Sequence, residues 1–203
     1  MRLRPKLLAI LVVAALVPLL VVALVAARVT LDSQERGLRN AARRQADVSV
    51  NLVLRSVETL GNQLVSFAAQ PNLRAALTRG PDAVRSVVRS SPVMLPNGYL
   101  QVFRPTGGSV WAQTIGGGQW SQLAVDAGAP AVAWGRAWSR RVTFALTDGT
   151  LVIRAVAPVV DDSLGLHGVL VFSQPLDGTF ADAIKGAIGS DVFVVGSQGK
   201  VMI

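Results

Sequence analysis

Two runs of apolar residues dominate the hydrophobic pattern of the C-terminal half of the chain. Thr150–Val160 and Val169–Leu176 are rich in Val, Ile and Phe, and the polar stretch 161–168 separates them. This spacing predicts a β-hairpin with a fairly long loop. Because apolar residues occupy consecutive positions in both runs, we expect each strand to be covered on both faces. The hairpin therefore belongs inside a sheet.

Shorter periodic segments surround this hairpin. Alternating apolar residues between glycine- and proline-containing turns predict further strands, and Asn72 is a candidate N-cap for the first of two short helices. The stretch 125–138 is weakly helical, with interruptions at Pro130 and Gly135. The other elements that the pattern predicts are helices Asn72–Thr78, Pro81–Arg89 and 177–188, the last with Phe180, Ile184 and Ile188 on one face, and strands Tyr99–Arg104, Ser109–Thr114, Val142–Leu146 and Asp191–Val195.

The N-terminal segment is apolar throughout. Leu7–Ala27 carries no charged residue and, at about 1.5 Å per residue, is long enough for the roughly 30 Å core of a bilayer. A cleaved signal peptide is the alternative, with Val25–Ala27 as a cleavage site, but its apolar core is usually only about 7–15 residues long. The pattern favours an uncleaved anchor. Basic residues flank both ends, and the cluster at Arg2, Arg4 and Lys6 favours an N-terminus inside and a body outside.

A long helix is predicted between this anchor and Pro71. Its first half is polar and rich in arginine, whereas its second half carries a heptad-like apolar stripe. We interpret the stripe as the contact face of a stalk helix that packs on its copy in a homodimer. An ordinary long core helix is the alternative. The stripe consists of Val53, Val57, Leu60, Leu64 and Phe67.

The charge distribution points to a membrane partner. The chain of 203 residues has a net charge of +8, but residues 1–89 hold 13 Lys and Arg against 5 Asp and Glu, whereas residues 90–203 hold 7 against 7. A nucleic-acid binder would carry its basic excess on a folded face with interleaved aromatic residues. Here the excess flanks an apolar segment. We therefore expect a membrane partner and no nucleic acid.

No constellation of residues suggests an enzyme. The chain has no cysteine, so it has neither a thiolate nucleophile nor a cysteine metal site. The single histidine, His167, lies between glycines and is interpreted as a solvated turn residue. Asp161 and Asp162 are adjacent and point apart in an extended chain, which makes them poor partners for acid–base chemistry. We expect no catalytic residue, no metal and no cofactor.

The order of these elements resembles the Cache family, the PAS-like extracytoplasmic sensor domains of bacterial receptors. Phe67–Leu77 is similar to the helix–break–helix that follows the family's stalk. The family's closing hairpin is similar to three segments of this chain: Leu151–Val159, Gly168–Ser173 and Leu176-Asp177. The segment Asp191–Val201 resembles the opening strands of a second module, as in double-Cache sensors. The resemblance implies that a second membrane helix and a cytoplasmic kinase, chemoreceptor or cyclase output follow in the complete receptor.

We therefore expect an α+β fold, in which an N-terminal transmembrane helix and a long stalk helix precede a PAS-like antiparallel sheet flanked by short helices. The predicted organisation is a transmembrane anchor at 1–28, a stalk helix at 29–70, a Cache sensor module at 71–189 and the truncated start of a second module at 190–203.

Aromatic and arginine residues upstream of the hairpin are candidates for ligand binding. Aromatic walls with a few polar groups are typical of small-ligand pockets, and ordinary core packing is the alternative. Arg136-Ala137-Trp138 resembles the Arg-x-Trp with which amino-acid-binding double-Cache sensors hold their ligand, although Ser139 stands where those sensors have Tyr. Arg154, between valines in its strand, requires an anionic partner, either an internal Asp or a ligand carboxylate. The candidate ligand-binding residues are Tyr99, Trp111, Trp134, Arg136, Trp138 and Arg154, and Trp120 lies near them in sequence.

Two functions remain open at this point. The first is a small-molecule sensing module of a bacterial receptor, held in the cytoplasmic membrane with its body on the extracytoplasmic side. The second is a membrane-tethered envelope protein with a structural or protein-interaction role and no ligand pocket. In neither case is the chain itself an enzyme.

Overall fold

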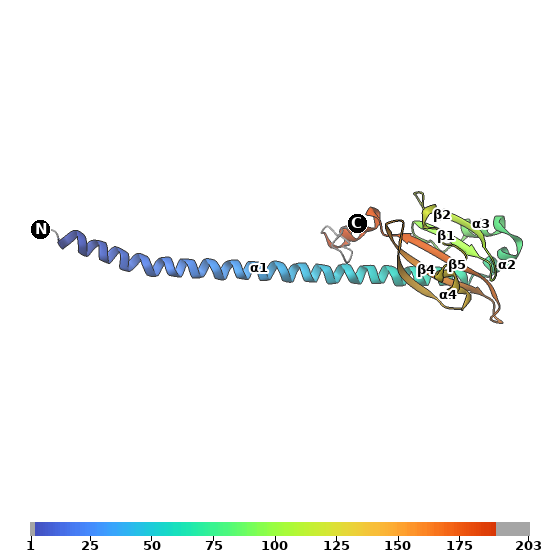
Figure 1. Cartoon of the computed structure of the whole chain (residues 1–203), viewed down its shortest axis with the longest axis horizontal. Coiled ribbons are helices and arrows are strands. Elements are labelled where there is room, and N and C mark those ends of the chain that lie inside the picture. The colour runs from blue at the N-terminus through green and yellow to red at the C-terminus, as the bar shows by residue number, and fades with distance from the viewer. Residues whose placement is uncertain (1–2, 190–203) are drawn as a thin grey trace. The chain divides into compact units, whose positions relative to one another are not determined.

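The protein is an α+β structure built around one antiparallel sheet (Figure 1). The computed structural model describes the backbone of residues 3–189 and the side chains of Leu20 and of residues 22–187 and 189. Within these residues, five strands lie in the order β2-β1-β5-β4-β3. The elements are α1 (Leu3–Ala68), α2 (Pro71–Arg79), α3 (Pro81–Ser90), β1 (Gly98–Phe103), β2 (Ser109–Ile115), η1 (Ser121–Leu123), α4 (Pro130–Arg136), β3 (Arg141–Thr147), β4 (Thr150–Val160), β5 (Leu166–Pro175) and α5 (Gly178–Ile188).

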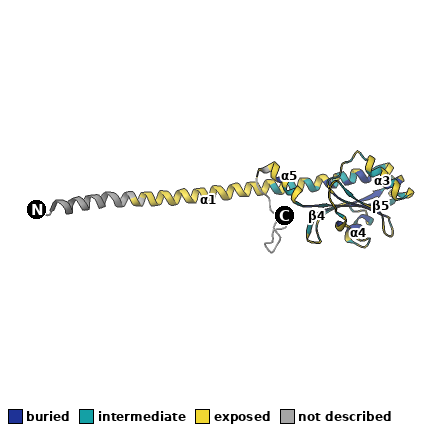
Figure 2. Ribbon diagram, turned by 90° about the horizontal axis from the view of Figure 1, so that it is seen from above, coloured by how far each residue is buried: buried dark blue, intermediate teal, exposed yellow. Residues whose placement is uncertain are grey.

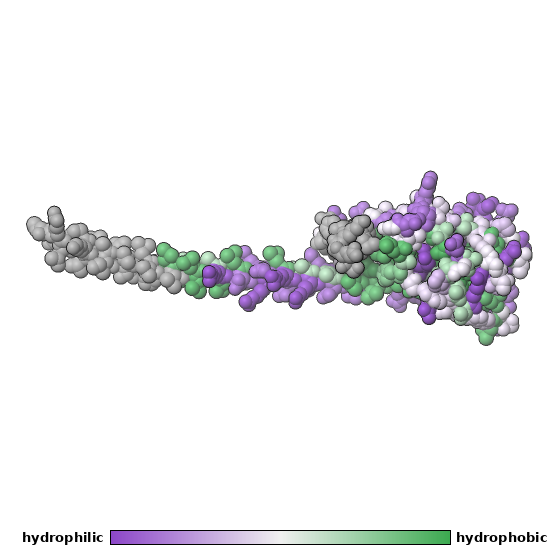
Figure 3. All heavy atoms as spheres, in the orientation of Figure 1, coloured by the Kyte–Doolittle hydropathy of each residue, from purple (hydrophilic) through white to green (hydrophobic). Residues whose placement is uncertain are grey.

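Helix α1 belongs to two compact units, one ending at Val48 and the other beginning at Ser49. In the first unit, the described side chains are exposed; apolar ones come first and hydrophilic ones follow along the helix (Figure 3). No helix in the described part of the chain is long and apolar enough to cross a membrane. Most of the predicted anchor, Leu7–Ala27, lies outside the described side chains, so the anchor stays a prediction.

The last turns of α1 are part of the core of the second unit. Leu60, Leu64 and Phe67 are each at most 1% exposed and pack with residues of the sheet. Their spacing of four and three residues places them on one face of the helix, which the sheet covers. For these three residues the structure confirms the alternative of a core helix. A homodimer through the stalk stays a prediction.

The predicted hairpin is confirmed as β4 and β5, and both strands are buried on both faces (Figure 2). One face of the sheet packs against α1, α2 and α3 through residues such as Ile153 and Phe172. The other face packs against α4 through residues such as Val156 and Val171. Strand β5 lies in the middle of the sheet, which explains its nearly unbroken apolar run.

Helix α3 begins at Pro81 as predicted, whereas α2 and α4 begin differently from the prediction. Helix α2 starts at Pro71 with Gln70 as its N-cap, so the expectation that Asn72 caps it is wrong. Proline suits the first helical position because its missing N–H would have no partner there. Pro130 likewise starts α4, and Gly135 lies inside that helix, so neither residue interrupts it. The predicted strand Asp191–Val195 lies outside the described residues.

Candidate functional site

One row of polar side chains crosses the whole sheet on the face that packs against α4. Each member of the row pairs with the next one on the neighbouring strand. From β2 through β1, β5 and β4 to β3, the members are Thr114, Tyr99, Ser173, Arg154 and Thr143. Residues directly opposite in antiparallel strands project from the same face of a sheet. Five residues from five strands thus form a single row, which brings together the predicted ligand residues Tyr99 and Arg154.

Arg154 is the charged centre of this row. Its Nε donates to the hydroxyl of Ser173 at 3.1 Å, and its Nη2 donates to the hydroxyl of Thr147 at 3.0 Å. Within the described residues it forms no ion pair. Partial burial lowers the pKa of the Arg154 guanidinium from its ordinary value, although an arginine stays charged in proteins. Within the described part of the chain, no aspartate therefore neutralises the charge of Arg154.

Helix α4 covers the neighbouring row on the same face. Ala131 and Val132 of α4 pack with Val156 and Val171, which lie two residues from Arg154 and Ser173 along their strands. The approach is close because Gly135 has no side chain: a Cβ there would collide with Val169 and Val156. The polar row thus lies along the margin of α4, beside an apolar floor.

Gln101 fixes the segment that leads into α4. Its side chain is 5% exposed, and its amide accepts from the backbone N–H of Val125 at 2.7 Å and donates to the carbonyl of the same residue at 3.1 Å. Gln101 is also on the α4 face, paired with Val171 of β5. A buried amide with both groups satisfied holds this loop in one position beside the row.

Arg136, at the end of α4, contacts backbone rather than carboxylates. Its Nη1 donates to the carbonyl of Ala127 at 3.1 Å and its Nη2 to the carbonyl of Gly107 at 2.6 Å. Its Nε is buried and has no hydrogen-bond partner among the described residues. The side chain therefore links the turn between β1 and β2 to the loop before α4.

The four tryptophans do not form one wall. Trp111 is 6% exposed in the core between the sheet and α1, so it lies on the opposite face from Arg154. Trp134 packs on the α4 side with the Arg141 guanidinium 5.0 Å from its ring centre. Trp120 donates from Nε1 to the carbonyl of Gly117 at 2.9 Å. Trp138 is 46% exposed and has a φ of 63°.

The sequence therefore pointed to two members of the row and missed the others. The row members Ser173, Thr143 and Thr114 carry no local signal of function, because only the pairing register places them in line with Arg154. Thr147 outside the row was missed too, because only its hydrogen bond with Arg154 connects it to the site.

A second polar cluster lies in the loop between β4 and β5. The Asp161 carboxylate accepts hydrogen bonds from the backbone N–H groups of Ser163 and Gly165 and from the Ser163 hydroxyl, and it lies 2.8 Å from Nε2 of His167. The bond with His167, followed by those with Ser163 and Gly165, holds the pKa of Asp161 well below its usual range. The prediction that His167 is a solvated turn residue is therefore wrong, because His167 lies at the start of β5, is half-buried and contacts the turn through Asp161. Among the described residues, no group of three or more His, Asp or Glu could hold a metal ion.

Comparison with known proteins identifies the fold. No protein-family model matches the sequence, and no curated protein matches it. Among solved structures, the chain is similar to the periplasmic domain of Vibrio cholerae LuxQ, with 14% identity over 79% of this chain and 76% of that one and a TM-score of 0.50. It is similar to the sensor domain of the V. cholerae histidine kinase DctB, with 16% identity over 77% of this chain and 61% of that one and a TM-score of 0.50. It is also similar to the sensor domain of Escherichia coli DcuS, with 16% identity over 67% of this chain and 99% of that one and a TM-score of 0.42.

These similarities show the fold alone, because the identities are so low. The body of the chain has the fold of periplasmic sensor domains of the Cache, PAS-like kind, and the predicted resemblance is confirmed.

Proposed function

We propose that this chain is the extracytoplasmic sensing module of a bacterial membrane receptor and that it binds a small carboxylate on the α4 face of its sheet. The observation that carries the proposal is the environment of Arg154. A partly buried guanidinium with only hydroxyl partners leaves a positive charge without an anion in the described structure. A ligand carboxylate is the missing partner that this geometry favours.

The hydrogen-bonding capacity of Arg154 suits a carboxylate. Its Nε is engaged with Ser173 and its Nη2 with Thr147, whereas its Nη1 has no partner in the described part of the chain. A guanidinium has five N–H donors, so Nη1 and the second hydrogen of Nη2 can bind a carboxylate together. Thr143 lies beside Arg154 in the row, and Tyr99 lies one strand further along it, beyond Ser173; both supply further hydroxyls.

The residues of α4 enter the proposal as the wall of the site. Arg136 holds the loop before α4 through the carbonyl of Ala127 and anchors it to Gly107. Trp134 packs against the apolar floor beside the row, and Trp138 follows directly after the helix. We assign Arg154 and Tyr99 to ligand contact and Arg136 to positioning of the wall.

The receptor context is also part of the proposal. Leu7–Ala27 would anchor the chain in the cytoplasmic membrane, and the output region would lie outside this sequence. The fold supports this arrangement because the similar solved structures include a sensor domain of a histidine kinase. Signalling would then rest on a ligand that binds one of two arrangements of the module more tightly.

A ligand screen tests the proposal. The full chain in lipid nanodiscs is titrated with amino acids and small mono- and dicarboxylates, and binding is measured calorimetrically. We expect at least one carboxylate to bind and Arg154→Ala to weaken it by about tenfold or more, because a hydrogen-bonded charge contributes roughly 1.5–3 kcal/mol. Arg89→Ala, at an exposed position of α3, is the matched control and should leave the affinity unchanged.

Two results would contradict the proposal. One is the absence of binding by every carboxylate in the panel, which would favour the alternative of an envelope protein without a ligand pocket. The other is a ligand whose affinity falls equally in Arg154→Ala and Arg89→Ala, since the two substitutions remove the same charge from different places.

A further inference from the structure

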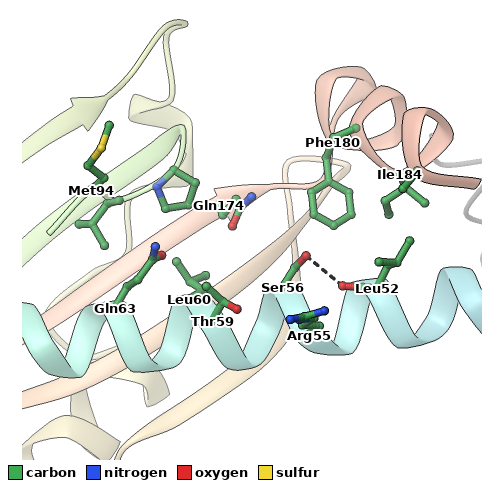
Figure 4. Close-up of a pocket in the computed structure, with 14 residues that line it drawn as sticks. Leu52, Arg55, Ser56, Thr59, Leu60, Gln63, Met94, Gln174, Phe180 and Ile184 are labelled. Carbon is green, nitrogen blue, oxygen red and sulfur yellow. Dashed lines mark hydrogen bonds between the residues drawn. The ribbon is translucent and has the colours of Figure 1, made fainter.

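A groove of about 570 Å³ lies on the other side of the sheet, between α1, α5 and the loop that precedes β1 (Figure 4). Its apolar surface includes Leu52 and Leu60 of α1, Met94 of the loop, and Phe180 and Ile184 of α5. This volume is within the range of roughly 300–1,000 Å³ that is typical of small-molecule sites. All of these residues belong to the second compact unit.

Small residues on α5 create the groove. Ala183 and Ala187 are one turn apart and line it, whereas Phe180 and Ile184 beside them reach towards α1. Ile184 is the one described α5 residue that is fully buried, at 6% exposure. A helix held by so few buried side chains is weakly docked, so a molecule that fills the groove would stabilise its position.

The polar groups of the groove favour an anion. Among the described residues that line it there is one charged residue, Arg55, and no Asp or Glu. Gln174 of β5 and Gln63 of α1 also line it, and within the described residues neither amide forms a hydrogen bond (Figure 4). A partly buried amide without a partner loses free energy that a ligand can restore. The groove thus offers one cation and two amides beside an apolar surface.

We propose that this groove is a second ligand site, which takes a small amphipathic monocarboxylate. The apolar chain of the ligand lies against Leu60, Phe180 and Ile184, and its carboxylate faces Arg55 and accepts hydrogen bonds from the free amides. The bound molecule joins α5 to α1. This site is separate from the row around Arg154, because Gln174 and Ser173 project from opposite faces of β5.

Hydrogen exchange of the full chain in lipid nanodiscs tests this site, with octanoate as the probe and octanol as its uncharged counterpart. We expect octanoate to slow exchange in α5 and in residues 52–63, and octanol to have a weaker effect. Arg55→Ala should weaken octanoate binding by about threefold to fivefold, as for an exposed ion pair. Arg44→Ala, at an exposed position of the same helix outside the groove, is the matched control.

A cavity-filling variant provides an independent measurement. Ala183→Leu should remove the effect of octanoate on α5 and leave the unfolding temperature unchanged or higher, because the new side chain occupies the ligand's space. Ala75→Leu, at an exposed position of α2, controls for the substitution itself.

Two results of the exchange experiment would overturn the inference: equal protection by octanol and octanoate, or protection of β4 and β5 around Arg154 without protection of α5. Two results with the variants would do the same: equal effects of Arg55→Ala and Arg44→Ala on octanoate binding, or full octanoate binding by Ala183→Leu. Protection of α5 that rises with protein concentration in the absence of octanoate would assign the groove to a second copy of the chain instead. Arg154→Ala should retain the octanoate response, so the two proposed sites succeed or fail separately.

Discussion

At the scale of single residues, Asp161 shows how one carboxylate can hold a loop. It accepts from two backbone N–H groups and one hydroxyl and pairs with the ring of His167. Each of these contacts favours the ionised carboxylate, which is why the pKa of Asp161 lies below its usual range. The turn between the two central strands therefore depends on a charge.

This charge gives the module a defined acid sensitivity. Because the pKa of Asp161 is lower in the folded than in the unfolded chain, its stabilising effect is present above the ordinary pKa of about 4 and is lost as the pH falls below it. We expect the free energy of unfolding of Asp161→Asn to fall less than that of the wild type between about pH 5 and pH 2. Urea titrations at a series of pH values measure this difference.

The matched control is Asp126→Asn, in the loop before α4, whose side chain forms no hydrogen bond within the described residues. Its pH dependence should equal that of the wild type. If the free energy of unfolding of Asp161→Asn depends on pH in the same way as that of the wild type, the loop does not depend on the carboxylate.

At the scale of elements, the position of α4 depends on the absence of a side chain at one residue. Gly135 faces Val169 and Val156 so closely that a methyl group would overlap both. Gly135→Ala should therefore destabilise the fold by about 1–3 kcal/mol, as other overpacking substitutions do, and move α4 away from the polar row. Urea unfolding and the affinity of the carboxylate found for Arg154 measure the two effects.

Gly186→Ala is the matched control for this substitution. Gly186 lies in α5 with open space around it, so alanine there should stabilise the helix by about 0.5–1 kcal/mol. Equal effects of the two substitutions would mean that α4 does not pack on the sheet as described.

The elements themselves were largely predictable, whereas their partners were not. Alternating and continuous runs of apolar residues predicted β1 to β5, because both patterns are local properties of a strand. The stripe on α1 was visible too, but periodicity shows only that a face is buried. Whether Leu64 meets a second helix or its own sheet depends on residues about a hundred positions away, and the structure places it against the sheet.

The same limit applies to the candidate site. Arg154 was predictable, because a single charge in an apolar strand needs a partner. The four tryptophans are close in sequence, but Trp111 of β2 and Trp134 of α4 lie on opposite faces of the sheet. The row around Arg154 and the groove beside α5 arise from pairings between distant segments, which no local pattern encodes.

At the scale of the whole molecule, the division of α1 between two units leads to a prediction about its parts. The fragment that begins at Ser49 retains Leu60, Leu64 and Phe67 and therefore the complete core of the second unit. We expect it to unfold cooperatively and to remain in the supernatant after membranes are sedimented. The full chain, with Leu7–Ala27, should sediment with the membranes.

A fragment that begins at Pro71 is the control for the core. It lacks the three buried residues of α1, and the loss of each should cost about 2–5 kcal/mol, so we expect it not to fold. Sedimentation of the Ser49 fragment with membranes, or recovery of the full chain in the supernatant, would contradict the proposed anchor.

Strand β5 connects the two proposed ligand sites, so binding at one of them can affect binding at the other. Ser173 contacts Arg154 on one face of the sheet, and the next residue, Gln174, lines the groove on the other. Two ligands bound at these positions would share a single strand. By thermodynamic linkage, the factor by which one ligand alters the affinity for the other is the same in both directions. A receptor built on this strand would respond to the combination of two concentrations rather than to either one alone.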